Sequence, residues 1–302
     1  MKHLLKLMDL SKEEIDEILD TADKLKYEKK NGITHHILKG KTLGMIFEKS
    51  STRTRVSFEV GMYDLGGAAL FLSSRDLQIG RGEPVEDTAR VLSRYVDGIM
   101  IRTYEQEEVE TLAKFSSIPI INGLTDYAHP CQVLADLMTI REFKGKLENL
   151  KLCFIGDGNN MANSLIVGCL TAGMKVSIAC PKEYTPAADV LEFAKAYGDK
   201  FILTDNVLEA AKDADAVYTD VWASMGQEEE AQQRREKFKG YQVNDEVMAV
   251  AAKDAIVLHC LPAHREEEIT TKQFEAHAKE IFEQSENRLH AQKAVMVRLM
   301  AR

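Results

Sequence analysis

Short apolar runs alternate with longer stretches of mixed apolar and polar residues in the first half of the chain. The runs have the length and composition of buried strands and lie at 43–47, 68–72, 98–101 and 118–121. Helical patterns separate them, for example at 56–66 and 83–96. Strands that alternate with helices predict a parallel sheet flanked by helices.

The polar segment FKGKLENLK, residues 143–151, interrupts this alternation, and the pattern then restarts. Further strand-like runs lie at 151–156, 176–180, 201–204, 216–222 and 255–262. We therefore predict an α/β protein of two domains in series, each a parallel sheet flanked by helices, the second Rossmann-like. The first domain should span residues 1–145 and the second residues 146–285.

Composition sets the broad class of the protein. The chain has 302 residues, 45% of them apolar and 29% charged, which fits a soluble globular protein of about two domains. No apolar run approaches the roughly 18 residues that span a bilayer. The N-terminal segment resembles neither a signal peptide nor a transit peptide; Ser11 and Glu14 instead predict a capping box. Five cysteines without a CxxC pair favour reduced thiols in the cytoplasm, and the net charge of -9 argues against nonspecific nucleic-acid binding.

Four hydroxyl side chains and two arginines fall within residues 50–55, between a predicted strand and a predicted helix. At such a helix start, unsatisfied backbone N–H groups and the positive end of the helix dipole form an anion site. Ser51, Thr52 and Thr54 can add hydroxyl donors, and an arginine can add a charged fork for phosphate. A capped helix with a solvated basic first turn fits the same residues.

The two arginines of this segment need not share a role. Side chains two residues apart on a helix point about 200° apart around its axis. Only one of Arg53 and Arg55 can therefore face an anion at the helix start. We predict that Arg53 binds the anion and that Arg55 has a structural role.

Two other stretches resemble known functional motifs, but the residues around them do not fit those functions. GDGNNMANS, residues 156–164, resembles a dinucleotide-binding turn, but Met161 replaces the third glycine and the next strand ends without the ribose-binding acid. His259 next to Cys260 suggests a thiolate nucleophile, but consecutive strand residues point to opposite faces, so His259 is badly placed to deprotonate Cys260. A free cysteine on an apolar strand is more often inert core. We predict neither an organic cofactor nor a metal, since no cluster has metal-ligand spacing.

Four motifs follow one another along the chain. They are STRTR at Ser51–Arg55, HPCQ at His129–Gln132, DVWASMG at Asp220–Gly226 and HCLP at His259–Pro262. An HP dipeptide alone is more often a turn than a catalytic site. Together, however, the motifs resemble the aspartate/ornithine carbamoyltransferase family over nearly the whole chain, from Lys49 to Arg288. The last two resemble the members that use ornithine rather than aspartate.

This resemblance implies transfer of a carbamoyl group from carbamoyl phosphate to the δ-amine of L-ornithine, which yields L-citrulline and phosphate. It implies that Arg102 contacts the phosphate and the carbonyl oxygen, that His129 donates to the same oxygen, and that Gln132 accepts from the amide. The carbamoyl phosphate ligands that it implies are Ser51, Thr52, Arg53, Thr54, Gln78, Arg102, His129, Gln132, Arg288 and the backbone carbonyls of Cys260 and Leu261.

For ornithine, the resemblance implies a contact of Asn160 with the α-carboxylate and of Asp220 with the α-ammonium group. Ser224 and Met225 would complete that pocket from a loop that closes over the substrate.

The family resemblance also implies features of the architecture. Gln78 would reach the phosphate of a neighbouring subunit, so the protein would be a homotrimer with shared sites, alone or within a larger assembly of trimers. A C-terminal helix, residues 286–302, would pack back on the first domain. The Leu261–Pro262 bond would be cis, as only bonds before proline commonly are.

Direct transfer is the mechanism that the resemblance implies, with Arg102, His129, Asp220 and Cys260 as the catalytic residues. The δ-amine has a pKa of about 10.4 by analogy with lysine, so it must lose a proton before it attacks. A closed, positively lined pocket would lower that pKa. Donors around the carbonyl would stabilise the oxyanion that forms, while Asp220 and Cys260 would position the amine.

Two other functions fit the same motifs. A related transferase could use putrescine or an N-acylated ornithine, but Asp220 requires a free ammonium group, which an N-acylated ornithine lacks. A noncatalytic relative could bind carbamoyl phosphate as a sensor or assembly partner, but the intact set of ligand residues argues against that function. Neither nucleic acid nor a membrane is expected as a partner.

Overall fold

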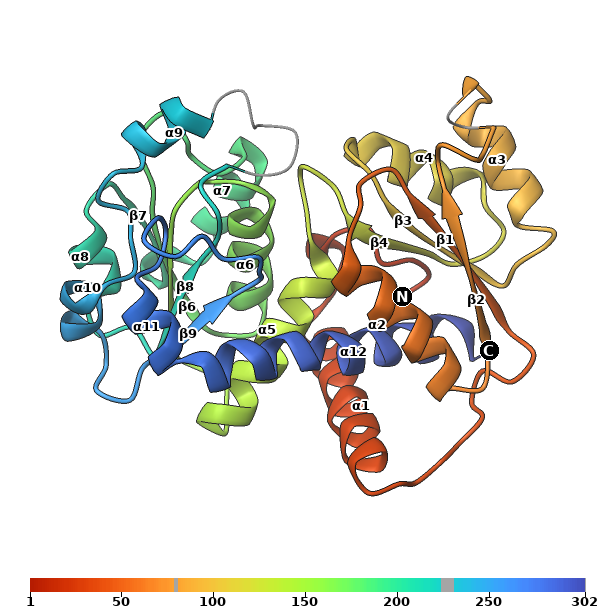
Figure 1. Ribbon diagram of the computed structural model, residues 1–302, viewed down its shortest axis with the longest axis horizontal. Coiled ribbons are helices and arrows are strands. Elements are labelled where there is room, and N and C mark those ends of the chain that lie inside the picture. The colour runs from red at the N-terminus through yellow and green to blue at the C-terminus, as the bar shows by residue number, and fades with distance from the viewer. Residues whose placement is uncertain (79–80, 224–230, 302) are drawn as a thin grey trace. The chain divides into compact units, whose positions relative to one another are not determined.

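The computed structural model describes residues 1–78, 81–223 and 231–301, which form two compact units (Figure 1). The first unit comprises Met1–Met138 and Asn287–Arg302, and the second comprises Thr139–Glu286. Helices α5 (Pro130–Lys144) and α12 (Ala278–Met300) contain residues of both units. Within the described part of the chain, no helix combines the length and the apolar character needed to cross a membrane.

The first unit is built on a sheet of parallel strands in the order β2-β1-β3-β4. The strands are β1 Thr42–Phe47, β2 Ala68–Ser73, β3 Gly98–Arg102 and β4 Ile120–Leu124. A 3-10 turn at Leu7–Asp9 precedes the helices, which are α1 Lys12–Lys30, α2 Thr52–Asp64, α3 Val85–Leu92 and α4 Gln106–Phe115. The predicted capping box is present at the start of α1, where Ser11 Oγ accepts from the backbone N–H of Glu14 at 3.2 Å.

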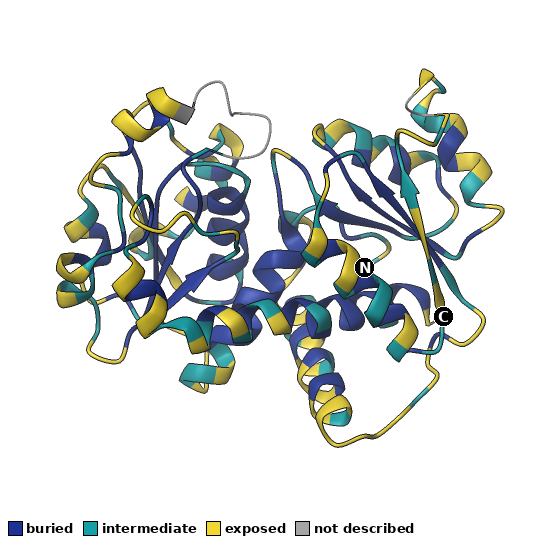
Figure 2. Cartoon of the chain, viewed as in Figure 1, coloured by how far each residue is buried: buried dark blue, intermediate teal, exposed yellow. Residues whose placement is uncertain are grey.

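The apolar core of the first unit lies where α3 and α4 meet the sheet. Its buried members are Ile46, Ala89, Val96, Ile99, Ile101, Val109, Leu112, Ala113 and Ile120. The edge strand β2 differs from this core, because Leu70 and Phe71 remain 47% and 40% exposed (Figure 2). Exposed apolar side chains on an edge strand mark a surface that another element or chain can cover.

Strand β4 does not begin where the apolar pattern placed it. The pattern predicts a strand at 118–121, but β4 starts after Pro119, which has no N–H to donate to a ladder, and it runs on to Leu124. The strand includes the buried Asn122, whose side-chain nitrogen donates to Leu5 O at 2.8 Å. A buried polar residue with a partner is compatible with a strand but breaks the apolar run that reveals one.

The second unit contains a parallel sheet in the order β7-β6-β5-β8-β9. Its strands are β5 Lys151–Ile155, β6 Lys175–Ala179, β7 Phe201–Thr204, β8 Ala216–Thr219 and β9 Ile256–His259. The shorter helices of this unit are α6 Asn160–Thr171, α7 Ala188–Lys195, α8 Val207–Ala211, α9 Ala231–Lys237, α10 Asp245–Val250 and α11 Thr271–Ala276, with a 3-10 turn at Gly198–Lys200.

This strand order confirms the predicted Rossmann-like sheet. The chain moves outward from β5 to β6 and β7, then returns to place β8 and β9 on the other side of β5. Ligands of such sheets bind beyond the carboxyl ends of the strands, at the point where the strand order reverses. Gly156 follows β5 and Asp220 follows β8 at that point, so the fold brings the two predicted turns of the second unit to one edge.

Candidate active site

The predicted anion site of the first unit lies at the N-terminus of a helix, as expected. Strand β1 ends at Phe47, and α2 begins at Thr52 with Ser51 as its N-cap. The Ser51 hydroxyl accepts from the backbone N–H of Thr54 at 3.2 Å and also contacts the Thr54 hydroxyl at 3.1 Å. The first turn of α2 therefore presents backbone N–H groups and hydroxyls at the positive end of the helix dipole.

Arg53 and Arg55 diverge as the helix geometry predicts. Arg55 is exposed, donates to Glu59 Oε1 at 3.0 Å and places its guanidinium 3.8 Å from the centre of the Phe71 ring. Arg53 is half-buried, and its charge reaches His129, whose pKa it helps to lower. Arg55 is thus held on the helix surface, while Arg53 lies on the side of the buried histidine.

Arg102 is the last residue of β3 and is 6% exposed. Its carbonyl accepts from the backbone N–H of Glu48 at 2.9 Å, which fixes the segment between β1 and α2 against the end of β3. In that segment Lys49 is buried, pairs with Asp126 and lies 4.1 Å from the centre of the Tyr104 ring. The strand end and the helix start are therefore locked together by backbone and charged contacts.

His129 is neutral at physiological pH. It is buried immediately before Pro130, the first residue of α5. Its pKa lies well below the ordinary value of 6.5, because burial removes water from the charged form and because Arg288, Arg102 and Arg53 repel a further positive charge. A neutral imidazole can donate one hydrogen bond without a net charge, which suits a group that polarises a carbonyl.

Arg288 joins three helices of the first unit. This residue of α12 is 3% exposed and donates to Gln132 Oε1 on α5 at 2.7 Å and to Thr54 Oγ1 on α2 at 3.2 Å. Gln132 in turn donates through Nε2 to Asp136 Oδ1 at 2.8 Å. The structure thus brings Thr54, Gln132 and Arg288 together, and it adds Asp136, which sequence reasoning missed although it lies one helical turn after Gln132.

Gln292 is a second residue that sequence reasoning missed. The Ser57 hydroxyl donates to Arg53 O at 2.6 Å, so it must accept from the amide nitrogen of Gln292. In that orientation the Gln292 oxygen accepts from Arg288 Nη2 and Nε at 2.9 and 3.1 Å. Gln292 therefore links the guanidinium of Arg288 to the first turns of α2. In the sequence, the only indication of this contact is that Gln292 lies one helical turn after Arg288.

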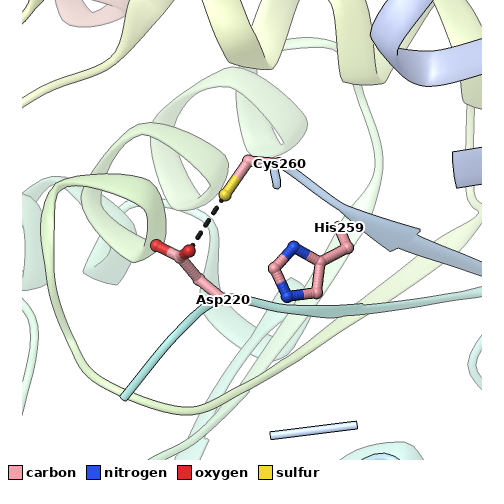
Figure 3. Close-up of side chains that lie close together, drawn as sticks. All are labelled: Asp220, His259 and Cys260. Carbon is pink, nitrogen blue, oxygen red and sulfur yellow. Dashed lines mark hydrogen bonds between the residues drawn. The ribbon is translucent and has the colours of Figure 1, made fainter. Parts of the chain in front are cut away.

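The second unit gathers polar side chains around Asp220, which follows β8. Cys260, which follows β9, donates its thiol to Asp220 Oδ1 at 3.0 Å (Figure 3). Asn159 Nδ2 donates to Asp220 Oδ2 at 3.1 Å, and the backbone N–H of Val221 donates to Oδ1 at 2.8 Å. This carboxylate is 7% exposed and is held in one orientation by its neighbours.

The adjacent asparagines have different positions at the start of α6. Asn159 is the N-cap, and its side-chain oxygen accepts from the backbone N–H groups of Met161 and Ala162 at 2.9 and 3.3 Å. Asn160, the predicted carboxylate ligand, is the first helical residue and is half-buried. Asn159 is the one that joins the helix start to Asp220, a contact that its N-cap position could have suggested.

His259 does not activate Cys260. Its Nε2 lies 2.9 Å from Glu268 Oε1, and its Nδ1 accepts from the backbone N–H of Leu261 at 2.9 Å. Both ring nitrogens therefore have partners other than the thiol, which donates to Asp220 instead (Figure 3). The expected cis bond between Leu261 and Pro262 is confirmed.

Two groups of described side chains have metal-ligand chemistry at close range. The ligand atoms of Asp220, His259 and Cys260 lie within 4.8 Å of one another, as do those of His264, Glu267 and Glu268. The first group was not apparent from sequence spacing because Asp220 follows β8, whereas His259 and Cys260 lie at the end of β9. Both nitrogens of His259 already have hydrogen-bond partners, so a metal there would compete with the contact that holds the Leu261 N–H.

The remaining predicted ligands are placed as follows. Gln78 is exposed in the segment that follows β2. Ser224 and Met225 lie outside the described residues. Cys131, which separates contact residues in HPCQ, donates its thiol to Asn122 O at 3.4 Å, and burial raises its pKa to about 12. Cys131 is therefore a packing residue rather than a reactive one.

Comparison with known proteins matches both units of the chain. Residues 2–142 match the family model described as "Aspartate/ornithine carbamoyltransferase, carbamoyl-P binding domain". Residues 148–299 match the one described as "Aspartate/ornithine carbamoyltransferase, Asp/Orn binding domain". The two matches together define a two-domain α/β carbamoyltransferase.

Individual relatives cover almost the entire chain. Ornithine carbamoyltransferase of Oceanobacillus iheyensis is 57% identical over 99% of this chain and 94% of the relative. That of Syntrophotalea carbinolica is 58% identical over 99% of each. The solved structure of ornithine carbamoyltransferase from Pyrococcus furiosus is 50% identical, with a TM-score of 0.94 over 99% of this chain and 97% of that one. The chain belongs to the aspartate/ornithine carbamoyltransferase family.

Proposed function

We propose that this protein transfers the carbamoyl group of carbamoyl phosphate to the δ-amine of L-ornithine, which gives L-citrulline and phosphate. One observation carries the proposal: the charges of Arg288, Arg102 and Arg53 all act on His129, and burial together with these charges keeps its ring neutral. A phosphate dianion next to a carbonyl needs this combination of fixed positive charge and a neutral donor.

In the first unit, the start of α2 and the three arginines hold the phosphate. Arg102 and His129 donate to the carbonyl oxygen, and Gln132 accepts from the amide. As the amine attacks, negative charge develops on that oxygen, and donors already fixed in place stabilise it without reorganisation. Phosphate then leaves the carbamoyl carbon as the new C–N bond forms.

In the second unit, Asp220 binds the α-ammonium group of ornithine and Asn160 binds the carboxylate. Asp220 is supported by Asn159 and Cys260, so its oxygens have a fixed direction before the amino acid arrives. Cys260 positions the δ-amine, and the neutral form of this amine is the nucleophile. Transfer requires the bound amine to reach the carbamoyl carbon, since no covalent enzyme intermediate is involved.

We extend the proposal to assembly and location: a homotrimer with shared sites in the cytoplasm. Leu70 and Phe71 are exposed on the edge strand β2, and Gln78 is exposed in the segment after it. A second copy that covers this edge would bring its neighbour's Gln78 to the phosphate. The test mixes two inactive variants, Gln78→Ala and Arg102→Met. Shared sites predict that hybrid trimers regain activity, whereas separate sites predict none.

A citrulline assay tests the activity itself, with carbamoyl phosphate and ornithine, putrescine, N-acetylornithine or aspartate offered in parallel. Turnover with ornithine alone is the expected result. Turnover with another amine would retain the carbamoyl phosphate site. N-acetylornithine as substrate would overturn the role of Asp220, and putrescine as substrate would overturn that of Asn160. Folded protein that binds carbamoyl phosphate but turns over none of the amines would be a noncatalytic binding protein.

A further inference from the structure

The amide of Gln132 is fixed between a donor and an acceptor. Arg288 Nη1 donates to Gln132 Oε1 at 2.7 Å, and Gln132 Nε2 donates to Asp136 Oδ1 at 2.8 Å. The three residues are 3%, 1% and 0% exposed in the order Arg288, Gln132 and Asp136. A flipped amide would turn its N–H groups toward the guanidinium and its oxygen toward the carboxylate, and both contacts would be unfavourable.

The orientation of this amide decides what it offers a ligand. A carbonyl oxygen accepts two hydrogen bonds, and Arg288 occupies one of these positions on Gln132. The other can accept from an N–H group of a carbamoyl amide. A flipped Gln132 would present N–H groups to that same amide, so donor would meet donor.

We propose that Asp136 is a positioning residue that sets the specificity of the site for a carbamoyl group over an acyl group without N–H. It acts through Gln132, whose oxygen it directs away from itself, and it does not touch the substrate. This inference rests on the proposed function, because it assumes that Gln132 accepts from the carbamoyl amide. A site built around such an acceptor discriminates strongly against an analogue that lacks the matching N–H.

Two stable ligands isolate this interaction. Phosphonoacetamide replaces the bridging oxygen of carbamoyl phosphate with a methylene group, and acetonylphosphonate further replaces the amide nitrogen with a methyl group. The ratio of their dissociation constants, measured by calorimetry, reports the amide contact alone. Wild-type protein should bind phosphonoacetamide about 30-fold more tightly than acetonylphosphonate, because the latter leaves the buried Gln132 oxygen without its donor.

Asp136→Leu should reduce this preference to about threefold or less, chiefly by weakening phosphonoacetamide, while the affinity for inorganic phosphate changes less than about twofold. Asp136→Asn can turn its own amide oxygen toward Gln132 and should keep most of the preference. Thermal unfolding of each variant shows whether it is folded. Equal weakening of both ligands by Asp136→Leu would make Asp136 a structural residue and overturn the proposal.

A double-mutant cycle separates action through Gln132 from action of another kind. In a Gln132→Leu background, the added Asp136→Leu change should leave the ligand ratio unaltered, because the group that it positions is gone. If Gln132→Leu alone keeps the wild-type ratio of dissociation constants, Gln132 does not contact the amide of the ligand. The proposal then fails, whether or not Asp136→Leu folds. Wild-type protein that binds neither phosphonate would instead refute the proposed function itself.

Discussion

The anion site of the first unit and the Asp220 site of the second differ in how their polar groups are supported. In the first unit, β3, α2, α12 and the residue before α5 present donors, and Arg288 connects α12 directly to α5 and α2. In the second, one carboxylate accepts from Cys260, Asn159 and the Val221 N–H. The proposed phosphate site thus combines positive charges from several elements, whereas the proposed amino-acid site depends on a single acidic group.

This difference predicts how each site fails when one residue is removed. A donor lost from the first site takes away stabilisation of charge that appears only during the reaction, so the catalytic rate should fall. The acid lost from the second site takes away recognition of one substrate and should leave the other substrate's affinity unchanged. The predictions below test that contrast in order of expected effect.

Arg102→Met should lower kcat by about three orders of magnitude, because one fixed donor to a developing oxyanion contributes a factor of that size. Arg55→Met is the matched control. Arg55 is exposed and bonded to Glu59, so its loss should change kcat less than about twofold. Initial-rate citrulline assays give both numbers. Similar losses in the two variants would mean that net charge, not position, governs catalysis.

Asp220→Asn should lower kcat/KM for ornithine by about 100-fold, the loss of a charge-assisted contact with an ammonium group. The dissociation constant of carbamoyl phosphate, measured by calorimetry without ornithine, should stay within about twofold. A large loss of carbamoyl phosphate affinity in this variant would contradict the separation of the two sites.

Gln292→Leu should raise KM for carbamoyl phosphate by about tenfold, because Arg288 loses an acceptor that fixes its guanidinium. KM for ornithine should not change. The matched control is Gln284→Leu, which makes the same change on the same helix. Gln284 accepts from the backbone N–H of His259 at 2.9 Å, a contact within the second unit. An unchanged KM for carbamoyl phosphate in Gln292→Leu would show that Arg288 is held well enough by Gln132 and Thr54.

The smallest expected effect concerns pH. His129 has a folded-state pKa well below 6.5, so above pH 6.5 it is neutral in both states and contributes nothing to pH dependence. As the pH falls below 6.5, the unfolded chain gains the proton before the folded chain does, and stability decreases. Urea unfolding of wild type and His129→Gln should show this difference.

Imidazole NMR provides a direct check of the same histidine. The His129 signals should keep the shifts of a neutral ring from pH 8 to pH 5.5. A His129 titration near pH 6.5 would mean that the ring is less buried, and the three arginines farther from it, than in the structure.

The strands and the helix start at Ser51 could be predicted from sequence because they depend on short-range patterns. Strand β1 at Thr42–Phe47 is a continuous apolar run, and the N-cap is a property of neighbouring residues. The bounds of β4 were wrong because Pro119, inside the predicted run, cannot donate to the ladder, and because the buried Asn122 breaks the apolar pattern within the strand.

The supporting residues of the site could not be predicted in the same way. Ser57 and Gln292 meet across 235 positions of sequence, and Asn159 reaches Asp220 across 61. Such contacts exist only after the sheet and helices have assembled. The family motifs identify residues proposed to touch substrate, whereas Asp136, Asn159 and Gln292 hold those residues in place and lie outside the motifs that revealed the family.

The position of Arg288 in the chain has a consequence for biosynthesis. It belongs to the first unit but follows the whole second unit in sequence. During translation, the first unit can form its sheet long before Arg288 has been made, yet Thr54 and Gln132 must wait for their shared partner. In a nascent or truncated chain the proposed phosphate site would therefore be incomplete, and we expect the ability to bind substrate to arise only when synthesis of the polypeptide is almost finished.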